Sequence, residues 1–180
     1  MADASVVDTN VLIVASAADD GSPFRPDATP VQEADLRQQV LDWLQAFERD
    51  ARRSVVLDWD WHICGEYQHK LNLDQDYGWL AIMAKRDRNE VAWVGIEVDA
   101  DGHAILPAGL SSAVTDLEDR KMVAAVLAAR ADDHQCRLVN ACDTDWLDCQ
   151  SALQDVGVEV HQLLSNWLQA RHQRKQRDGG

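Results

Sequence analysis

Carboxylate side chains follow two short segments that have the composition of buried β-strands. Asp8 follows Ser5-Val6-Val7, and Asp143 follows Leu138-Val139-Asn140-Ala141-Cys142. Two carboxylates a few ångström apart repel each other, and both stay ionised only if a cation neutralises them. Hard oxygen ligands of this kind favour Mg²⁺ or Mn²⁺. If the two segments are neighbouring strands of one sheet, Asp8 and Asp143 predict a divalent metal site.

Further acids could join this pair. Glu66 lies in the middle of a segment expected to be helical (61–71), and Asp119 lies in the first turns of a helix that a Thr115-Asp116-Leu117-Glu118 capping box would open. Asp116 and Asp119 are three residues apart and can share a helix face. Each acid alone also has a structural explanation, as a helix N-cap, a partner of the helix dipole or a solvated side chain. The chemical prediction therefore depends on all of them together.

Strands and helices alternate along the chain, and they must position these acids. Short apolar runs predict strands, and periodic apolar spacing or cap residues predict helices. The expected strands are 4–8, 54–58, 137–142 and 158–163, and the expected helices are 9–16, 33–51, 61–71, 77–86, 115–132 and 145–154. Alternation of this kind is typical of an α/β fold with a parallel sheet, whose ligands bind at the carboxyl ends of the strands.

Two regions depart from the alternation. Residues 90–98 and 103–106 are β-prone and flank Asp99-Ala100-Asp101-Gly102, so we expect a hairpin or an irregular insertion within 74–112. Residues 169–180 carry four basic residues and are expected to form a flexible basic tail behind a domain that covers 1–168.

Composition limits the functional classes. A chain of 180 residues fits one domain, and 46% apolar residues with seven tryptophans fit a packed core. A net charge of -14 argues against broad binding to nucleic-acid backbones or anionic membranes. The four cysteines lack zinc-site spacing, and no membrane span or signal peptide is recognisable. We therefore expect a cytoplasmic protein without membrane partners.

In order along the chain, four segments resemble the PIN-domain ribonuclease family. They are Val6-Val7-Asp8-Thr9-Asn10-Val11-Leu12, Glu66-Tyr67, Asp119 to Ala125, and Leu138 to Trp146, and they span most of the chain. The resemblance implies a three-layer α/β/α sandwich around a central, mostly parallel sheet. It also implies a metal-dependent endoribonuclease that hydrolyses phosphodiester bonds of RNA with Mg²⁺ or Mn²⁺.

The resemblance implies a role for each residue that occupies a matching position in the family's motifs. The residues that resemble the catalytic quartet are Asp8, Glu66, Asp119 and Asp143, and those expected to ligate metal are Asp8, Asp119, Asp143 and Asp145. Asn10 would orient the Asp8 carboxylate or a metal-bound water, Asp116 would support the site, and Arg120 and Lys121 are candidates for contacting a substrate phosphate. This chain departs from the family at Ala141, where members often carry Thr, and at Trp146, where they carry Phe.

The resemblance also suggests partners. RNA is the expected substrate, and a toxin-antitoxin or defence role would add an inhibitory or activating protein partner. A homodimer stays open. Tryptophans in the middle of the chain, Trp59, Trp61, Trp79 and Trp93, could stack on RNA bases or pack in the core.

Two other functions stay open. The chain could be a catalytically silent PIN scaffold that acts as a binding module. Alternatively, Val55-Val56-Leu57-Asp58-Trp59-Asp60 resembles the motif of haloacid-dehalogenase-type phosphatases, with Asp58 as nucleophile and Asp60 as acid and base. Against the phosphatase, Trp61-His62 replaces the expected small residues, and no downstream lysine with an acidic pair follows.

Overall fold

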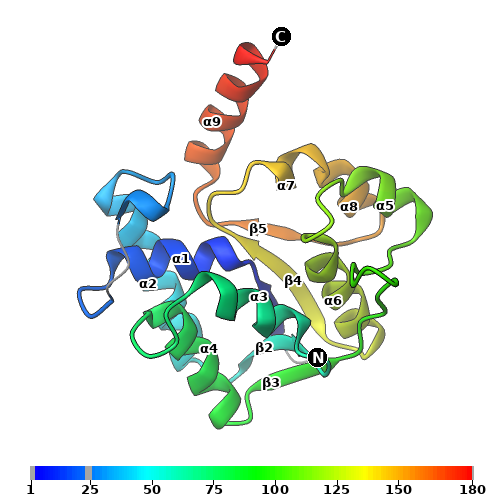
Figure 1. Ribbon diagram of the computed structural model, residues 1–180, viewed down its shortest axis with the longest axis horizontal. Coiled ribbons are helices and arrows are strands. Elements are labelled where there is room, and N and C mark those ends of the chain that lie inside the picture. The colour runs from blue at the N-terminus through cyan, green and yellow to red at the C-terminus, as the bar shows by residue number, and fades with distance from the viewer. Residues whose placement is uncertain (1–2, 23–25, 180) are drawn as a thin grey trace.

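A sheet of five parallel strands forms the centre of the molecule (Figure 1). The structure is a computed structural model that describes residues 3–22 and 26–179. Its strands are β1 (Asp3–Val7), β2 (Arg53–Asp58), β3 (Val91–Val94), β4 (Gln135–Asn140) and β5 (Val160–Gln162). They lie side by side in the order β3-β2-β1-β4-β5.

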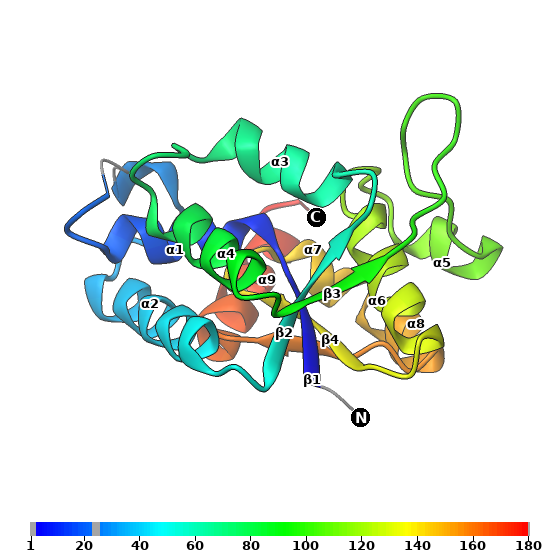
Figure 2. The same cartoon turned by 90° about the horizontal axis from the view of Figure 1, so that it is seen from below.

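Helices cover both faces of this sheet, as Figure 2 shows. One layer holds α1 (Thr9–Ala18), α2 (Ala34–Arg49) and α4 (Tyr77–Asp87), which pack against one another. The other layer contains α6 (Arg120–Ala131), which contacts β1 to β4. The remaining helical elements are α3 (His62–Lys70), α5 (Ala108–Ala113), α7 (Asp145–Asp148), α8 (Gln150–Asp155), α9 (Ser165–Asp178) and the short 3-10 turn Pro26–Ala28. The expected three-layer α/β/α sandwich is confirmed.

The central strands are buried on both faces. In β1, the four residues from Ala4 to Val7 are all buried, and in β2 the four residues from Val55 to Asp58 are buried as well. A strand with helices on both sides has no solvent face, so its sequence is a continuous apolar run and does not alternate. This explains why these short runs predicted strands correctly.

The topology places the switch in strand order between β1 and β4. The chain builds outward from β1 through β2 to β3 and then crosses to β4 and β5 on the other side. Because β1 pairs with β4, with Val7 opposite Val139, the residues after both strands meet at one edge. Ligands of open α/β sheets bind at such switch points.

The region from 90 to 106 combines an edge strand with an irregular loop, in which a minimal antiparallel pairing encloses the expected turn. Val91–Val94 is β3, the edge strand that pairs in parallel with β2. Only a single antiparallel bridge, Val98 to Ala104, spans the following loop, and the short helix α5 after it was not predicted. Four β-prone residues can extend a sheet or pair with a neighbouring segment, and the parallel partner is too distant in sequence for local patterns to reveal.

The predicted capping box at 115–118 was wrong. α6 begins at Arg120, and the Asp116 carboxylate accepts the backbone N–H of Glu118 in a turn before it. Arg120 explains the difference, because its guanidinium donates to the carbonyls of Val114 (3.1 Å) and Ser111 (2.7 Å). These bonds fasten the preceding segment to the end of α5 and delay the helix.

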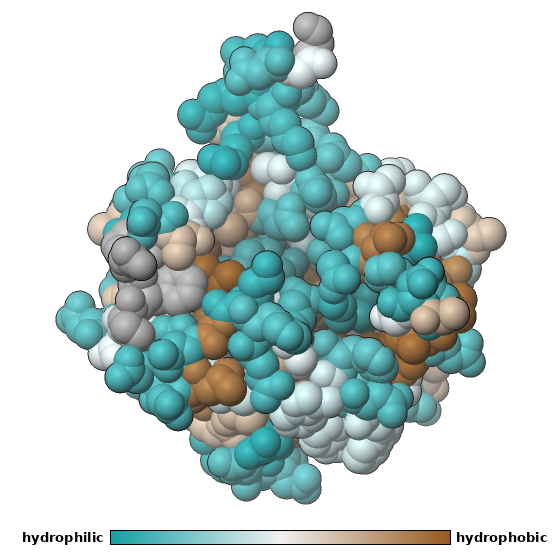
Figure 3. All heavy atoms as spheres, in the orientation of Figure 1, coloured by the Kyte–Doolittle hydropathy of each residue, from teal (hydrophilic) through white to brown (hydrophobic). Residues whose placement is uncertain are grey.

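The C-terminal region is more helical than expected. The helix expected over 145–154 is divided at Cys149 into α7 and α8, and β5 is shorter than the strand expected over 158–163. The segment expected as a flexible basic tail is helical through Asp178, so the boundary at 168 falls inside α9. This helix projects from the sheet (Figure 1), and its surface is hydrophilic in Figure 3. An ion pair between Lys175 and Asp145 and a hydrogen bond between His172 and Asp148 connect it to α7.

Candidate metal centre

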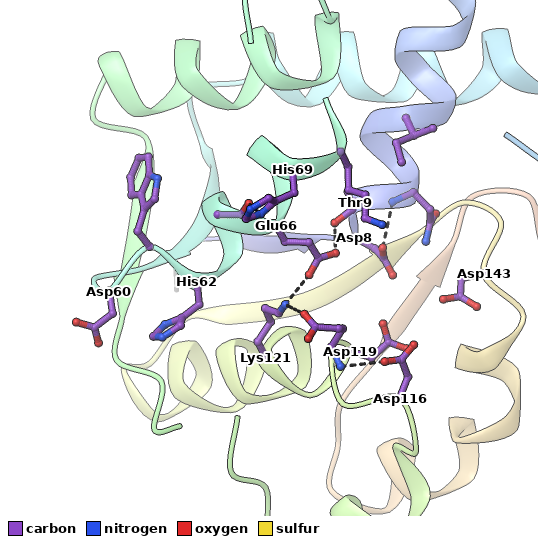
Figure 4. Close-up of a pocket in the computed structure, with 16 residues that line it drawn as sticks. Asp8, Thr9, Asp60, His62, Glu66, His69, Asp116, Asp119, Lys121 and Asp143 are labelled. Carbon is purple, nitrogen blue, oxygen red and sulfur yellow. Dashed lines mark hydrogen bonds and ion pairs between the residues drawn. The ribbon is translucent and has the colours of Figure 1, made fainter. Parts of the chain in front are cut away.

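Three aspartates from three separate elements meet at the switch point. Asp8 is the N-cap of α1, Asp119 is the N-cap of α6, and Asp143 follows β4. One carboxylate oxygen from each lies within 4.8 Å of the other two. We call Asp8, Asp119 and Asp143 the acidic trio. Figure 4 shows the trio in a cavity of about 710 Å³.

Two hydrogen bonds fix the orientation of the Asp8 carboxylate, which is only 6% exposed. Its Oδ1 accepts the backbone N–H of Asn10 at 3.1 Å, and its Oδ2 accepts the indole N–H of Trp146 at 2.6 Å. Trp146 is completely buried. The sequence reasoning missed this contact, and the one available signal was the tryptophan at a position where the resembled family carries phenylalanine, which has no N–H group.

Burial raises the pKa of every member of the trio. Desolvation is the main cause at each position, and it raises the pKa of Asp8 to about 7 and that of Asp119 to about 8. The pKa of Asp143 is also raised by its burial. Charges of neighbouring trio members add to the effect at Asp8 and Asp119. A divalent cation would stabilise the ionised forms and displace the protons.

Glu66 lies in the same cavity without joining the trio. One of its carboxylate oxygens accepts the hydroxyl of Thr9, and the other forms an ion pair with Lys121 at 2.7 Å. Lys121 also pairs with Glu118 at 2.5 Å. The structure therefore gives Glu66 an internal lysine partner that none of the trio has among the described residues.

Asp145, the other predicted metal ligand, lies outside the trio. Its side chain is 47% exposed and pairs with Lys175 of α9 at 2.8 Å. Its backbone N–H donates to Oδ1 of Asp143 at 2.9 Å. Asp145 thus orients a trio carboxylate through its main chain, and its own carboxylate contacts the C-terminal helix.

Asn10 acts differently from the expected orienting side chain. The Asn10 amide donates to Oδ1 of Asn140 at 2.9 Å, and its own Oδ1 accepts the backbone N–H groups of Ala141 (2.9 Å) and Cys142 (3.2 Å). These bonds tie the first turn of α1 to the end of β4. The side chain therefore holds together the two segments that carry Asp8 and Asp143.

The remaining predicted residues divide between the cavity and the scaffold. Asp116 and Lys121 both line the cavity, as expected of groups near a substrate. The guanidinium of Arg120, in contrast, is engaged by the two carbonyls that end α5. Two histidines and a lysine also line the cavity without having been predicted as site residues: His62, His69 and Lys70. All three come from α3, whose side chains have no motif spacing that would have revealed them.

Asp58, the nucleophile of the phosphatase alternative, is 1% exposed and caps α3. Its oxygens accept the backbone N–H groups of His62 (2.9 Å) and Ile63 (2.8 Å), and Nδ1 of His62 lies 2.8 Å from Oδ2. A carboxylate so enclosed has no free approach for a phosphoryl group, so the geometry disfavours the phosphatase.

A second group, Asp99, Asp101 and His103, also has ligand atoms within 4.8 Å of one another. Asp99 accepts the backbone N–H groups of both Asp101 and His103, so its carboxylate shapes the turn. We assign this group a structural role.

Neither family models nor curated proteins nor solved structures match this chain. The functional argument therefore depends on the geometry above. Within residues 3–22 and 26–179, every helix is too short or too polar to cross a membrane.

Proposed function

We propose that this protein is a divalent-metal-dependent endoribonuclease of the PIN-domain type, in which Asp8, Asp119 and Asp143 hold Mg²⁺ or Mn²⁺. The observation that carries the proposal is the trio itself. One buried and two half-buried carboxylates, all with raised pKa values, have oxygens within 4.8 Å of one another, and no lysine or arginine of the described residues forms an ion pair with them. Such a cluster is unfavourable unless a cation or protons neutralise it.

The residues fit a hard divalent cation. All three offer carboxylate oxygens, without sulfur or imidazole, which is the set preferred by Mg²⁺ and Mn²⁺. When bound, such a cation lowers the pKa of a coordinated water and neutralises charge on a phosphodiester. Asp8 is already oriented by Asn10 and Trp146, and Asp143 by the N–H of Asp145. Such positioning by neighbouring groups tunes metal ligands.

Lys121 supplies positive charge inside the cavity. It forms ion pairs with two glutamates, Glu66 and Glu118, and its side chain is 12% exposed. A substrate phosphate can share this ammonium group because lysine offers three rotatable N–H donors. In this proposal Lys121 would donate a hydrogen bond to the phosphodiester beside the trio.

The choice of RNA rests on the resemblance to PIN-domain ribonucleases, which also suggests a toxin-antitoxin or defence context. An effector of that kind would have a protein partner that masks the cavity until RNA cleavage is required. A masked site is compatible with an acidic surface that by itself attracts RNA weakly.

The test is cleavage of labelled single-stranded and structured RNA with Mg²⁺, with Mn²⁺ and with EDTA. We expect cleavage only with metal, and a loss of at least about 100-fold in Asp8→Asn and Asp143→Asn because each removes a ligand charge. Asp145→Asn is the matched control, since it removes a carboxylate that lies outside the trio and should retain most activity. Absence of cleavage for every RNA, or equal cleavage by Asp8→Asn, would overturn the proposal.

Calorimetric titration with Mn²⁺ distinguishes the nuclease from the silent scaffold. Binding of Mn²⁺ that depends on Asp8, together with cleavage, supports the nuclease. If Mn²⁺ does not bind, or binds equally to Asp8→Asn, the scaffold is the better description.

A further inference from the structure

Three tryptophans form a stack beside the cavity, in which Trp59 is exposed while Trp61 and Trp93 are half-buried and pack against the core. The ring centroids of Trp59 and Trp93 are 4.9 Å apart, with an interplanar angle of 19°. The ring centroids of Trp61 and Trp93 are 6.5 Å apart, with an interplanar angle of 22°. We call these residues the tryptophan stack. Trp59 is 66% exposed, the largest exposed fraction among the big hydrophobic side chains of the described residues. A tryptophan whose role is packing is buried, as Trp146 is.

The backbone holds the stack in place at some conformational cost. Trp59 donates its N–H to the carbonyl of Val94 at 3.0 Å, so the turn after β2 stays attached to the edge strand that carries Trp93. Trp61 has a φ of 67°, a left-handed conformation that favours glycine and is rare for a bulky residue. A large aromatic side chain at such a position suggests that the ring itself is used.

The stack leads directly into the candidate metal centre. Trp61 lines the same cavity as Asp8 and Asp143. In Figure 4, its neighbours Asp60 and His62 lie on one side of the cavity and Asp143 on the opposite side, with Lys121 between them. A nucleotide chain whose bases contact the stack would therefore extend across the lysine toward the trio.

The acidity of the protein favours stacking over phosphate contacts. With a net charge of -14, the chain cannot hold an RNA backbone by broad electrostatic attraction. Stacking of bases on aromatic rings does not depend on net charge and tolerates any base sequence. Duplex bases are already stacked inside their helix, so an exposed aromatic surface selects single strands.

We propose that the tryptophan stack is a binding site for the bases of single-stranded RNA next to the scissile phosphodiester. This inference rests on the proposed nuclease function, because it identifies the substrate class of that same cavity. Trp59 would provide the outermost ring, and Trp61 would place the next base at the cavity entrance.

The test compares Trp59→Ala with Trp59→Phe in an Asp143→Asn background that does not cleave. The probe is a fluorescein-labelled oligoadenylate of about ten nucleotides, a length within the usual range for single-strand sites. We expect Trp59→Ala to raise the dissociation constant about tenfold, as loss of one stacked base does, and Trp59→Phe to restore most of the affinity. Trp59 is exposed, so neither change removes core packing. Ile105→Ala, which truncates another exposed hydrophobic side chain (53%), is the control and should bind like the parent.

Several outcomes would overturn the stacking proposal. These are equal affinity in Trp59→Ala, no measurable binding by the parent, and equal weakening for single-stranded and duplex RNA. A concentration-dependent dimer that Trp59→Ala abolishes, without an effect on RNA, would instead make the stack a contact between protein copies.

Cleavage by the unmodified chain separates this inference from the nuclease proposal. If metal-dependent cleavage is lost in Asp8→Asn and unchanged in Trp59→Ala at every RNA concentration, the nuclease function is supported and the base-binding role of the tryptophan stack is refuted. If Trp59→Ala weakens RNA binding and no metal supports cleavage, the base-binding role of the tryptophan stack is supported and the nuclease function is refuted. If both hold, Trp59→Ala should raise KM much more than it lowers kcat.

Discussion

Replacing Asp8 with asparagine should stabilise the metal-free protein at high pH and do so progressively less as the pH falls. In the folded chain, burial raises the Asp8 pKa from 3.8 to about 7. Since each pKa unit corresponds to about 1.4 kcal/mol, an ionised Asp8 costs about 4 kcal/mol relative to the unfolded chain. Asparagine has nearly the same shape and carries no charge, so it removes this cost.

The sign of the pH dependence follows from the raised pKa. A folded-state pKa above the unfolded value means that the folded protein binds the proton more tightly. Its stability contribution is then complete below about pH 3.8 and is lost as the pH rises through about 7. Between pH 5 and pH 8, the advantage of Asp8→Asn over the wild type should therefore grow by about 2–3 kcal/mol.

Asp8→Asn also loses a hydrogen bond, which lowers the free energy of unfolding by an amount that does not depend on pH. The Asp8 carboxylate accepts one N–H on each oxygen, from Asn10 and from Trp146. An asparagine amide has one oxygen and one NH₂ group, so one of these N–H donors is left without an acceptor, at about 1–3 kcal/mol. The quantity to measure is therefore how the difference in free energy of unfolding between Asp8→Asn and the wild type changes with pH.

The assay is denaturant or thermal unfolding in EDTA between pH 5 and pH 8. For a chain of this size, the predicted growth corresponds to roughly 5–10 °C in the difference between the two melting temperatures. Saturating Mn²⁺ should stabilise the wild type at pH 8 and leave Asp8→Asn almost unchanged. Parallel pH profiles for the wild type and Asp8→Asn would refute the reasoning.

Four further substitutions test the scaffold around the site. Asn10→Ala removes the bonds that join α1 to the end of β4 and should lower the free energy of unfolding by about 2–4 kcal/mol, measured by urea denaturation. Gly78→Ala would place a Cβ 2.5 Å from the Leu12 carbonyl oxygen and should cost about 2 kcal/mol or more, whereas Gly65→Ala, whose Cβ meets nothing within 4 Å, should leave the melting temperature the same or higher. Lys175→Met breaks an exposed ion pair and should change stability by less than about 1 kcal/mol; a larger loss would mean that α9 is integral to the domain.

The positions of Asp8 and Asp143 could be predicted because both follow short buried strands. A strand covered on both faces is a continuous apolar run, and a polar residue directly after it marks the carboxyl end. The pairing of β1 with β4 joins residues more than a hundred positions apart, such as Val7 and Val139, and no local pattern encodes it. From the sequence, a metal site could therefore be predicted only on the condition that these two strands pair.

The parts that sequence reasoning missed depend on tertiary contacts. Thr115 and Glu118 have the spacing of a capping box, but the bonds from Arg120 to the end of α5 postpone the helix. The tryptophan stack needs the turn after β2 to meet the edge strand, and Trp59 lies far from Trp93 in sequence. The amino-acid composition also does not show which tryptophans are buried: Trp59 is exposed and Trp146 is buried.

The distribution of lysines divides the five acids expected around the metal into two kinds. Lys121 neutralises Glu66, and Lys175 neutralises Asp145. Asp8 is buried, Asp119 and Asp143 are half-buried, and none of the three has an ion-pair partner in the described part of the chain. If the purpose of the fold were stability alone, the lysines would relieve the acids for which burial raises the pKa. Instead, the lysines pair with Glu66 and Asp145, and the acidic trio is left without a positively charged partner. This placement is what a metal site needs, because a lysine within the trio would compete with the divalent ion for the same oxygens.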